Sequence, residues 1–424
     1  MRVAPSYGWY GDDFTGATDT LATLARRGQR AFLFLGIPGA RHLAEAGDLD
    51  AVGIAGAARA MGPEEMRAEL EPVGAFFRAL GVRILHYKCC STFDSAPERG
   101  NIATAIKVLR NHVEHPTVAI VGGQPSLGRY CAFSTLFAAF GEGGEIYRLD
   151  RHPTMSRHPA TPMTEADLRR HLAFLGLPDI AAIHWPLLDQ DADRVLVQWE
   201  QAAGSSAAIL FDALEDRHLG AIGHVLRSVS RKRSLLVVGA SSVAQAAFEE
   251  ADAIRSQPEA GAGPVLAFVG SLSPTTRRQV AAARSYHRIP VRPDELTTNG
   301  EYERVADIAA AMLAQGRNVM ISTAPEDGDA PAVAVADLAD RSAVLVDRIL
   351  ERHPVRRLAI AGGDTSSRIV GALGFWGLGY ESQVGNGVAV SAARSDVASR
   401  DRMRVLLKGG QMGPEDLFER FLIM

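Results

Sequence analysis

The 424-residue chain contains only three cysteines, and two of them, Cys89 and Cys90, are adjacent. So few thiols cannot form the disulfide framework of a small secreted domain, and the content suits a reducing compartment. Neither the adjacent pair nor Cys131 belongs to a spaced set of cysteines and histidines. This disfavours a structural zinc site and gives no support to a cysteine nucleophile. We therefore expect the chemistry of this chain to lie in other residue types.

Basic excess and long apolar runs are also lacking. The 45 Lys and Arg residues are outnumbered by 49 Asp and Glu residues, which gives a formal net charge of -4. A nucleic-acid partner would require a basic face, so none is expected. The first residues lack the apolar region of a signal peptide, and no run of about 18 apolar residues could span a membrane. We expect a cytoplasmic protein with a small-molecule ligand, and a homo-oligomer remains open.

What is present is an alternation of short apolar runs with amphipathic helical stretches such as Pro63–Leu80 and Asn101–Val113. Such alternation implies crossover connections and mostly parallel sheets. A chain of 424 residues is too long for one typical core. The predicted strands are Ser6–Tyr10, Ala31–Leu35, Ala51–Ala55, Val82–Tyr87, Thr117–Val121, Ile180–His184, Ala207–Phe211, Leu235–Val238, Val265–Val269, Asn318–Thr323, Leu358–Ala361, Val388–Ser391 and Arg404–Leu407.

A segment rich in proline and glycine, residues 251–264, interrupts this rhythm and is the best linker candidate. The fold class predicted is therefore α/β, with two α/β domains of mostly parallel sheets facing a central cleft. The predicted boundaries are residues 1–250 for the first domain and 265–424 for the second.

Two adjacent carboxylates, Asp12 and Asp13, follow the first predicted strand and open a helix that ends near Gly28. Turns at the carboxyl ends of strands line the ligand crevice of an open α/β sheet, and Gly11 and Gly16 permit close backbone approach. An ordinary helix capped by an aspartate is an equally good interpretation of the spacing alone.

A second polar cluster follows the strand that ends near Lys88 and continues through Ser91 and Thr92 to Arg99. If this strand lies beside the first one, its cation and hydroxyls would suit a hydroxylated, anionic ligand near the two aspartates. The alternative is a lysine that merely ends a strand, followed by a local serine–threonine turn.

Residues 148–163 form a stretch dense in charge and proline, which predicts a loop rather than a regular element. Its basic residues, among them Arg151 and His158, could close over an acidic substrate. A solvated surface loop explains the composition equally well.

Glycine-containing turns follow three predicted strands of the second domain. They are Gly270-Ser271-Leu272-Ser273-Pro274, Gly362-Gly363-Asp364-Thr365 and Lys408-Gly409-Gly410. Unpaired backbone N–H groups and hydroxyls at a helix N-terminus favour a phosphate. None of the turns has the GxxxxGK(S/T) pattern of a Walker loop or the GxGxxG spacing of a dinucleotide fold, so each is weak evidence alone.

Taken together and in this order, the DDFTGATD, KCCST, HPATPM, GSLSPTT, AGGDTS and KGGQMG segments resemble the four-carbon acid sugar kinase family over essentially the whole chain. The resemblance implies a sugar-acid-binding N-terminal domain, a nucleotide-binding C-terminal domain, and ATP-dependent phosphorylation of a terminal hydroxyl on an acid such as threonate or erythronate. Asp12 and Asp13 would lie at the reacting hydroxyl. The positions implied to surround ATP are Ser271, Ser273, Gly362, Gly363, Asp364, Thr365, Gly409 and Gly410.

Several positions depart from the usual family pattern. Gly11 stands where alanine is common, and Gly409 and Gln411 replace serine and asparagine. The YGDDFTG and KCCSTFDS forms resemble a branch that includes kinases of 3-oxo-isoapionate, a branched sugar acid.

Phosphoryl transfer requires in-line positioning, Mg²⁺ on the phosphates and a carboxylate that accepts the hydroxyl proton. One of Asp12 and Asp13 is the candidate base, while Lys88, Ser91, Thr92 and Arg99 are candidate substrate ligands. Arg99 could instead cap a helix. No protein metal site is assigned, because the Mg²⁺ would accompany ATP. A non-catalytic sugar-acid sensor and a dinucleotide-dependent dehydrogenase are the rival functions.

Overall fold

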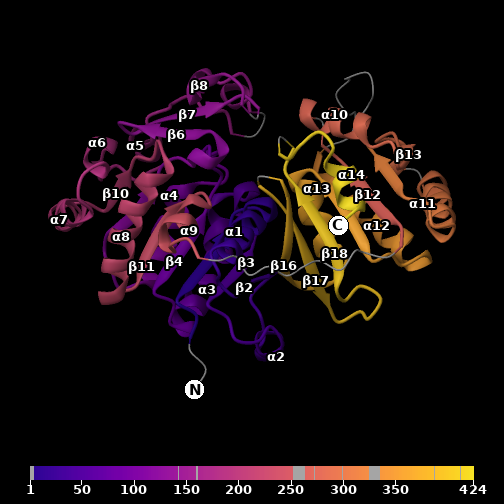
Figure 1. The fold of residues 1–424 in the computed structure, drawn as a ribbon, viewed down its shortest axis with the longest axis horizontal. Coiled ribbons are helices and arrows are strands. Elements are labelled where there is room, and N and C mark those ends of the chain that lie inside the picture. Colours follow the sequence, from indigo (N-terminus) through magenta and orange to yellow (C-terminus); the bar gives the residue numbers. More distant parts are fainter. Residues whose placement is uncertain are drawn as a thin grey trace. The chain divides into compact units, whose positions relative to one another are not determined.

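The computed structural model describes residues 4–424 except 142, 159–160, 252–262, 272, 298, 324–334, 386 and 411. The chain divides into two compact units, Met1–Ile254 and Arg255–Met424 (Figure 1). Most of the linker predicted at residues 251–264 lies outside the described residues. Each unit has an α/β architecture and is described separately.

Unit 1 contains one parallel sheet in the order β2-β3-β1-β4-β11-β5-β10-β9. Its strands are β1 Tyr7–Gly11, β2 Ala31–Phe34, β3 Ala51–Ala55, β4 Ile84–Lys88, β5 Val118–Val121, β9 Ile180–Ile183, β10 Ala208–Phe211 and β11 Leu235–Gly239. Its helices are α1 Phe14–Arg26, α2 Ala40–Glu45, α3 Pro63–Leu80, α4 Ile102–Leu109, α5 Leu168–Phe174, α6 Trp185–Leu188, α7 Ala192–Ala203, α8 Asp216–Lys232 and α9 Ser242–Ala247.

Every residue of β1, β3, β4 and β11 is buried, as expected for parallel strands covered by helices on both faces. Large side chains fill the space that glycines leave. The Trp9 ring occupies the position of a side chain at Gly53, and Phe77 of α3 lies against Gly8. The core of unit 1 thus fixes β1 at the centre of the sheet, and its position decides where the acidic turn lies.

A small antiparallel sheet, absent from the prediction, consists of β6 Arg129–Ala132, β7 Thr135–Ala139 and β8 Ile146–Arg148. The turn between β6 and β7 places Phe133 and Ser134 at φ 49° and 66°. Left-handed turns usually contain glycine or asparagine, so the sequence carried no hairpin signal there.

Unit 2 has the strand order β13-β14-β12-β15-β18-β17-β16. Its strands are β12 Val265–Val269, β13 His287–Pro290, β14 Val319–Ser322, β15 Arg357–Ala361, β16 Phe375–Gly385, β17 Val388–Ser395 and β18 Met403–Lys408. Its helices are α10 Pro274–Ala282, α11 Asn299–Ala314, α12 Val335–Arg352, α13 Gly363–Ala372 and α14 Leu417–Leu422.

The first five strands of that order run parallel, whereas β16 and β17 are antiparallel to their neighbours. Both β13 and β16 were missed by the sequence analysis. The pairing of β16 with β17 contains irregularities of register, and six residues of β16 from Tyr380 onward are mostly half-buried. This weakens the hydrophobic alternation that marks a strand.

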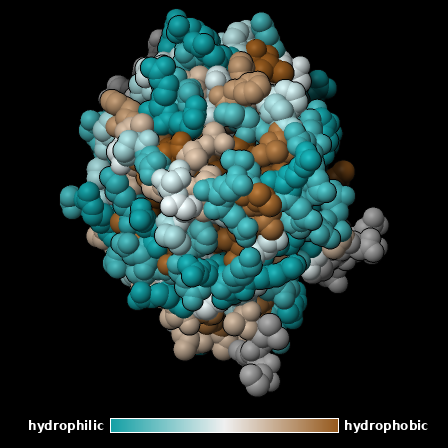
Figure 2. Space-filling view, turned by 90° about the vertical axis from the view of Figure 1, so that its left-hand side faces the viewer, coloured by the Kyte–Doolittle hydropathy of each residue, from teal (hydrophilic) through white to brown (hydrophobic). Residues whose placement is uncertain are grey.

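The surface of unit 1 on the side of α7 is mainly hydrophilic, with hydrophobic residues in small separate groups (Figure 2). Scattered apolar residues of this kind are normal for a protein surface. None of the helices in the described part of the chain has the length and apolar character needed to cross a bilayer.

Candidate active site

The acidic turn lies at the point where the strand order of unit 1 reverses. From β1 the chain passes to β2 and β3 on one side, and β4 then pairs with the other side of β1. Gly11, the last residue of β1, is in register with Ala55 of β3 and Lys88 of β4. The turns after these three strands therefore meet at one edge of the sheet, as at a ligand-binding switch point. The predicted proximity of Lys88 to the aspartates is confirmed.

Asp13 is the N-cap of α1 and accepts a hydrogen bond from the Gly16 amide at 2.6 Å. Its other carboxylate oxygen accepts a hydrogen bond from the Thr15 hydroxyl at 3.0 Å and lies 2.8 Å from Nη1 of Arg59. The cap of the capped-helix interpretation is thus confirmed, but the solvated acids that this interpretation also assumed are not found, because Asp12 is buried. The cap does not exclude a second role for Asp13. The carboxylate is tied to the helix and to a cation at the same time.

Arg59 bridges the two aspartates. Its Nη2 donates to Oδ1 of Asp12 at 3.0 Å, while its Nη1 pairs with Asp13. Sequence reasoning missed this residue, although it follows the correctly predicted strand 51–55. The available signal was its place just beyond the carboxyl end of a strand, the same argument that identified Lys88.

The two carboxylates titrate differently. Burial raises the pKa of Asp12 above its usual range, and Arg59 only partly offsets this effect. Burial also acts to raise the pKa of Asp13, but Arg59, Lys88 and the hydrogen bonds from Gly16 and Thr15 outweigh it and lower that pKa. At neutral pH Asp13 is therefore firmly ionised.

Lys88 is buried at the end of β4, and its Nζ donates to the Cys89 carbonyl at 2.7 Å. A side chain at Gly16 would come within 2.6 Å of both Lys88 Nζ and Asp13 Oδ1. Glycine at this position therefore leaves room for a cation and a carboxylate to approach the same point. By contrast, the space beside Gly11 is filled by Ala17, so that glycine serves helix packing.

The segment after Lys88 contributes fewer groups than predicted. Thr92 is buried and lies 3.0 Å from the Cys90 sulfur, while Ser91 is half-buried. Arg99 is exposed, and Asn101 rather than Arg99 caps α4. Burial raises the pKa of the Cys90 thiol to about 11, so it stays protonated at neutral pH.

In the loop of residues 148–163, the structure does not bring Arg151 and His158 to the aspartates. Arg151 is exposed, and Nδ1 of His158 lies 3.1 Å from the Thr161 amide, which donates to it. Among the described residues no hydrogen bond or ion pair joins either side chain to Asp12 or Asp13. The buried histidine of this loop is His152, which sequence reasoning did not select.

The three glycine turns of unit 2 also begin at one edge. Val269, Ala361 and Lys408 are in register at the ends of β12, β15 and β18. Gly362 has φ 125°, which disfavours other residues, and a side chain at Gly270 would come 2.3 Å from the Thr365 hydroxyl. Among the described residues, a side chain at Gly363 would meet no atom within 4 Å beyond its chain neighbours and the backbone of its own helix. Open space therefore exists at the N-terminus of α13, where a phosphate would bind.

A hydrogen-bond network connects the turns after β12 and β18. The Ser273 and Thr276 hydroxyls both donate to the Gly410 carbonyl, the latter at 2.9 Å. Lys408 is fully buried, and its Nζ donates to Oγ1 of Thr276 at 2.7 Å and to Oε1 of Gln279 at 2.6 Å. Burial lowers the pKa of Lys408 to about 7. Gly410 is thus held against α10 by two hydroxyls and by the buried Lys408 amine.

A pocket of about 250 Å³ adjoins this edge of unit 2. Val280, Ala281, Met320 and Pro290 supply an apolar lining, and Ser271 connects it to the glycine turns. A flat, apolar group joined to a phosphate would match this combination.

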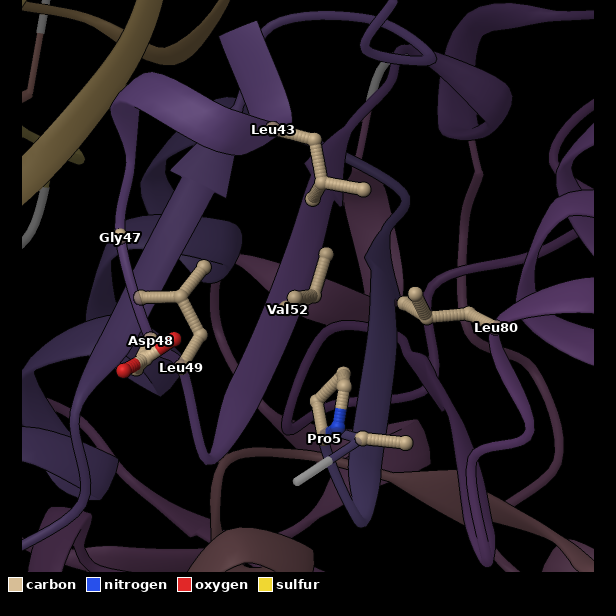
Figure 3. Close-up of a pocket in the computed structure, with 8 residues that line it drawn as sticks. Pro5, Leu43, Gly47, Asp48, Leu49, Val52 and Leu80 are labelled. Carbon is tan, nitrogen blue, oxygen red and sulfur yellow. The ribbon is translucent and has the colours of Figure 1, made fainter. Parts of the chain in front are cut away.

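Another pocket, of about 170 Å³, lies in unit 1 between Leu43, Leu49, Val52 and Leu80 (Figure 3). Pro5 also lines it and precedes β1, so the pocket is at the amino ends of the strands, opposite the acidic turn. No group of three or more His, Cys, Asp or Glu side chains in the described ranges is arranged to hold a metal ion.

Comparison with known proteins defines the class first. Residues 7–247 match the model of a sugar-binding N-terminal domain, and residues 266–418 match that of a nucleotide-binding C-terminal domain. The chain is 35% identical to 3-oxo-isoapionate kinase of Paraburkholderia graminis, over 97% of this chain and 92% of the relative. It is 30% identical to 3-oxo-tetronate kinase of Methylobacterium radiotolerans, over 98% of both chains. Both relatives are named as kinases.

The chain belongs to the four-carbon acid sugar kinase family. The sequence-based predictions of the family, of an α/β fold and of an ATP-dependent phosphotransferase acting on a sugar acid are confirmed. A Salmonella typhimurium LT2 protein, provisionally assigned as a tRNA synthase, shares the fold with a TM-score of 0.82, 25% identity and coverage of 98% of both chains. A Haemophilus influenzae protein shares it with a TM-score of 0.73 and 23% identity, again over 98% of both chains.

Proposed function

We propose that this enzyme transfers the γ-phosphoryl group of ATP to a terminal hydroxyl of a branched 3-oxo sugar acid, as its relative's name, 3-oxo-isoapionate kinase, indicates. The identity to that relative is 35%, against 30% for the 3-oxo-tetronate kinase of Methylobacterium radiotolerans. An unbranched 3-oxo-tetronate is the second candidate. The structural observation that carries the proposal is the Asp12–Arg59–Asp13 cluster at the reversal point of the sheet.

Asp13 is the better candidate for the carboxylate that accepts the hydroxyl proton. Its side chain is 17% exposed, against 3% for Asp12. Asp12 is buried behind Arg59 and would hold that guanidinium in place. A carboxylate that is ionised and fixed by a helix N-cap and a cation can receive a proton without rearrangement.

The glycine turns of unit 2 would hold the nucleotide. Backbone amides at the N-terminus of α13 and the hydroxyls of Ser271 and Thr365 are donors suited to phosphate oxygens. The nucleobase would occupy the apolar pocket beside Val280 and Met320. Mg²⁺ bound with ATP would neutralise phosphate charge, and serine and threonine oxygens are ligands that it accepts.

Lys88, with Ser91 and Thr92 nearby, would contact the acid from the β4 side of the cluster, because Lys88 and Asp13 flank Gly16. Arg99, Arg151 and His158 are weaker candidates for the same role, since each is exposed or engaged locally. A homo-oligomer stays a prediction.

The test is a comparison of kcat/KM for 3-oxo-isoapionate and for the 3-oxo-tetronates, measured by coupled ADP release with Mg-ATP. One missing or extra carbon substituent usually changes kcat/KM by about 10 to 200-fold. We expect the branched acid to be preferred by a factor in this range. A preference for the unbranched acids would select the second candidate, and turnover of neither would reject the proposal.

A further inference from the structure

Asp94 is a buried carboxylate without a partner. It is 6% exposed, and its Oδ1 is buried with no hydrogen-bond donor. Among the described residues no ion pair reaches its carboxylate. Burying a charge without a hydrogen bond costs several kcal/mol, so such a group is rare unless a ligand completes it.

The same region contains a buried donor that also lacks a partner. Nε of Arg129 is buried without an acceptor, while its Nη1 donates to the Leu127 carbonyl at 2.6 Å. Burial lowers the pKa of Arg129, and the negative charge of Asp94 partly opposes this effect. Arg129 and Asp94 are therefore close enough to interact electrostatically, yet they do not satisfy each other.

The backbone at this point is strained. Phe93, which is fully buried, adopts φ 54°, a left-handed conformation that non-glycine residues rarely adopt. Next to Asp94, the Ser95 hydroxyl donates to the Phe93 carbonyl at 2.7 Å, and its oxygen lies 2.8 Å from Nε2 of His171. The Ser95 and His171 side chains are thus paired, whereas Asp94 Oδ1 and Arg129 Nε are among the buried polar atoms of the described residues that have no partner.

Asp94 also interacts electrostatically with Arg59, the residue that bridges Asp12 and Asp13. Burial lowers the pKa of Arg59, but Asp12 and Asp13, with a smaller contribution from Asp94, outweigh it and raise that pKa. Arg59 follows the carboxyl end of β3 and Asp94 follows that of β4, and these two strands flank β1. Both residues therefore belong to turns at the edge of the sheet that carries the two aspartates.

We propose that Asp94 and Arg129 form the specificity site for the sugar acid, an inference that rests on the proposed function. The Asp94 carboxylate accepts hydrogen bonds from substrate hydroxyls that are not phosphorylated. The Arg129 Nε–H donates to an anionic or carbonyl oxygen of the same molecule. Both residues recognise the substrate and take no part in phosphoryl transfer.

The first measurement compares wild-type enzyme with the Asp94→Asn and Asp94→Ala variants. We expect KM for the sugar acid to rise at least about tenfold, while KM for ATP changes less than about twofold, because a buried partner is removed from the acid alone. The matched control is Glu98→Gln, which changes an exposed carboxylate in the same segment. An unchanged KM for the acid would overturn the inference.

A substrate series adds a readout that a structural role would not change. The series consists of deoxy analogues, each lacking one hydroxyl. The analogue that lacks the hydroxyl contacted by Asp94 should bind the wild-type enzyme at least about tenfold more weakly than the complete acid. In Asp94→Ala this penalty should disappear for that analogue and persist for the others. Equal weakening of all analogues in the variant would mean a structural role.

Thermal unfolding of the ligand-free protein separates the two roles again. An unpartnered buried carboxylate destabilises the fold, so Asp94→Asn should leave the melting temperature unchanged or raise it. A marked decrease would indicate a structural partner and contradict the inference. Calorimetric binding of the acid to wild type and Asp94→Asn tests the site even if catalysis fails. Failure of phosphoryl transfer by the wild-type enzyme would instead reject the proposed function.

Discussion

At the scale of single residues, the acceptor site depends on one carboxylate with two tasks. Asp13 caps α1 through the Gly16 amide and also pairs with Arg59. The cap gives the carboxylate a fixed position, and the cation keeps it ionised. Both features come from the place of the residue between a strand and a helix.

Asp13→Asn should lower kcat by about 100-fold or more, with little change in KM for ATP, because a general base usually contributes a factor of this size. Asparagine is also a good N-cap, so the helix should persist and the melting temperature should change little. Steady-state kinetics with Asp12→Asn in parallel distinguishes the two aspartates. A near-normal kcat for Asp13→Asn together with a large loss for Asp12→Asn would transfer the role to Asp12.

The pH dependence of kcat should show the effect of Arg59 on the pKa of Asp13. Arg59 and Lys88 hold the pKa of Asp13 down against burial, so wild-type activity persists until the pH falls through this lowered value. Arg59→Met removes one cation, the pKa of Asp13 rises, and activity should be lost at a higher pH. Arg59→Lys keeps a positive charge, so its pH profile should lie between those of the wild type and Arg59→Met. Arg78→Met changes an exposed residue of the same unit and should not move the profile. An acid limb that stays in place in Arg59→Met would contradict this electrostatic account.

Sequence reasoning could identify Asp12, Asp13 and Lys88 because each ends or follows a recognisable strand. Arg59 was missed because it stands among alanines, with no other polar side chain close to it in the sequence. Asp94 lies within the KCCSTFDS segment, but its lack of a partner depends on the three-dimensional structure and cannot be read from the spacing of residues. The candidates Arg99, Arg151 and His158 were selected for their charge, and charge does not determine which way a side chain points.

At the scale of elements, the N-terminus of α13 is the predicted phosphate site. Gly363→Val should weaken binding of ATP and ADP at least about tenfold, because a side chain would fill space now open beside the backbone amides. Sugar-acid binding should be unaffected. Gly371→Val is the matched control, since it changes a glycine of the same helix with equally open surroundings. Calorimetry showing unchanged nucleotide affinity in Gly363→Val would place the phosphate elsewhere.

Lys408, the last residue of β18, should couple nucleotide binding to protonation of its own amine. The pKa of Lys408 is lowered to about 7 by burial, so at a pH about one unit higher the amine is mostly neutral. A bound polyanion nearby should raise this pKa, and binding of ADP should then take up protons. The affinity of the protein for ADP should fall as the pH rises through about 7.

The measurement is calorimetry of ADP in buffers of different ionisation enthalpy. Lys408→Met should remove the proton uptake, whereas Lys232→Met, on the surface of unit 1, should retain it. Equal uptake in wild type and Lys408→Met would show that Lys408 does not sense the nucleotide.

Elements with long or evenly apolar patterns were predicted well. The strand Ala51–Ala55 and the helix Pro63–Leu80 have the predicted bounds. The sheet β6–β8 was missed because its turn contains Phe133 and Ser134 instead of glycine. The hairpin β16–β17 was found only in part because half-burial and irregular register mask its alternation. Irregular pairing and non-glycine turns are decided by tertiary contacts, which local pattern does not contain.

At the scale of the whole molecule, the acceptor groups lie in residues 1–254 and the glycine turns lie in residues 255–424. The account requires that a phosphoryl group held by the second unit reaches an acid held by the first. ATP consumption alone does not establish this, because water can also accept the phosphoryl group.

The most direct test is mass spectrometry of the sugar acid after incubation of the full chain with Mg-ATP and 3-oxo-isoapionate. The account predicts that the acid gains one phosphoryl group, in proportion to the ADP formed, and that Asp13→Asn forms little product in the same time. ADP release without a phosphorylated acid, or phosphorylation at an undiminished rate by Asp13→Asn, would contradict it.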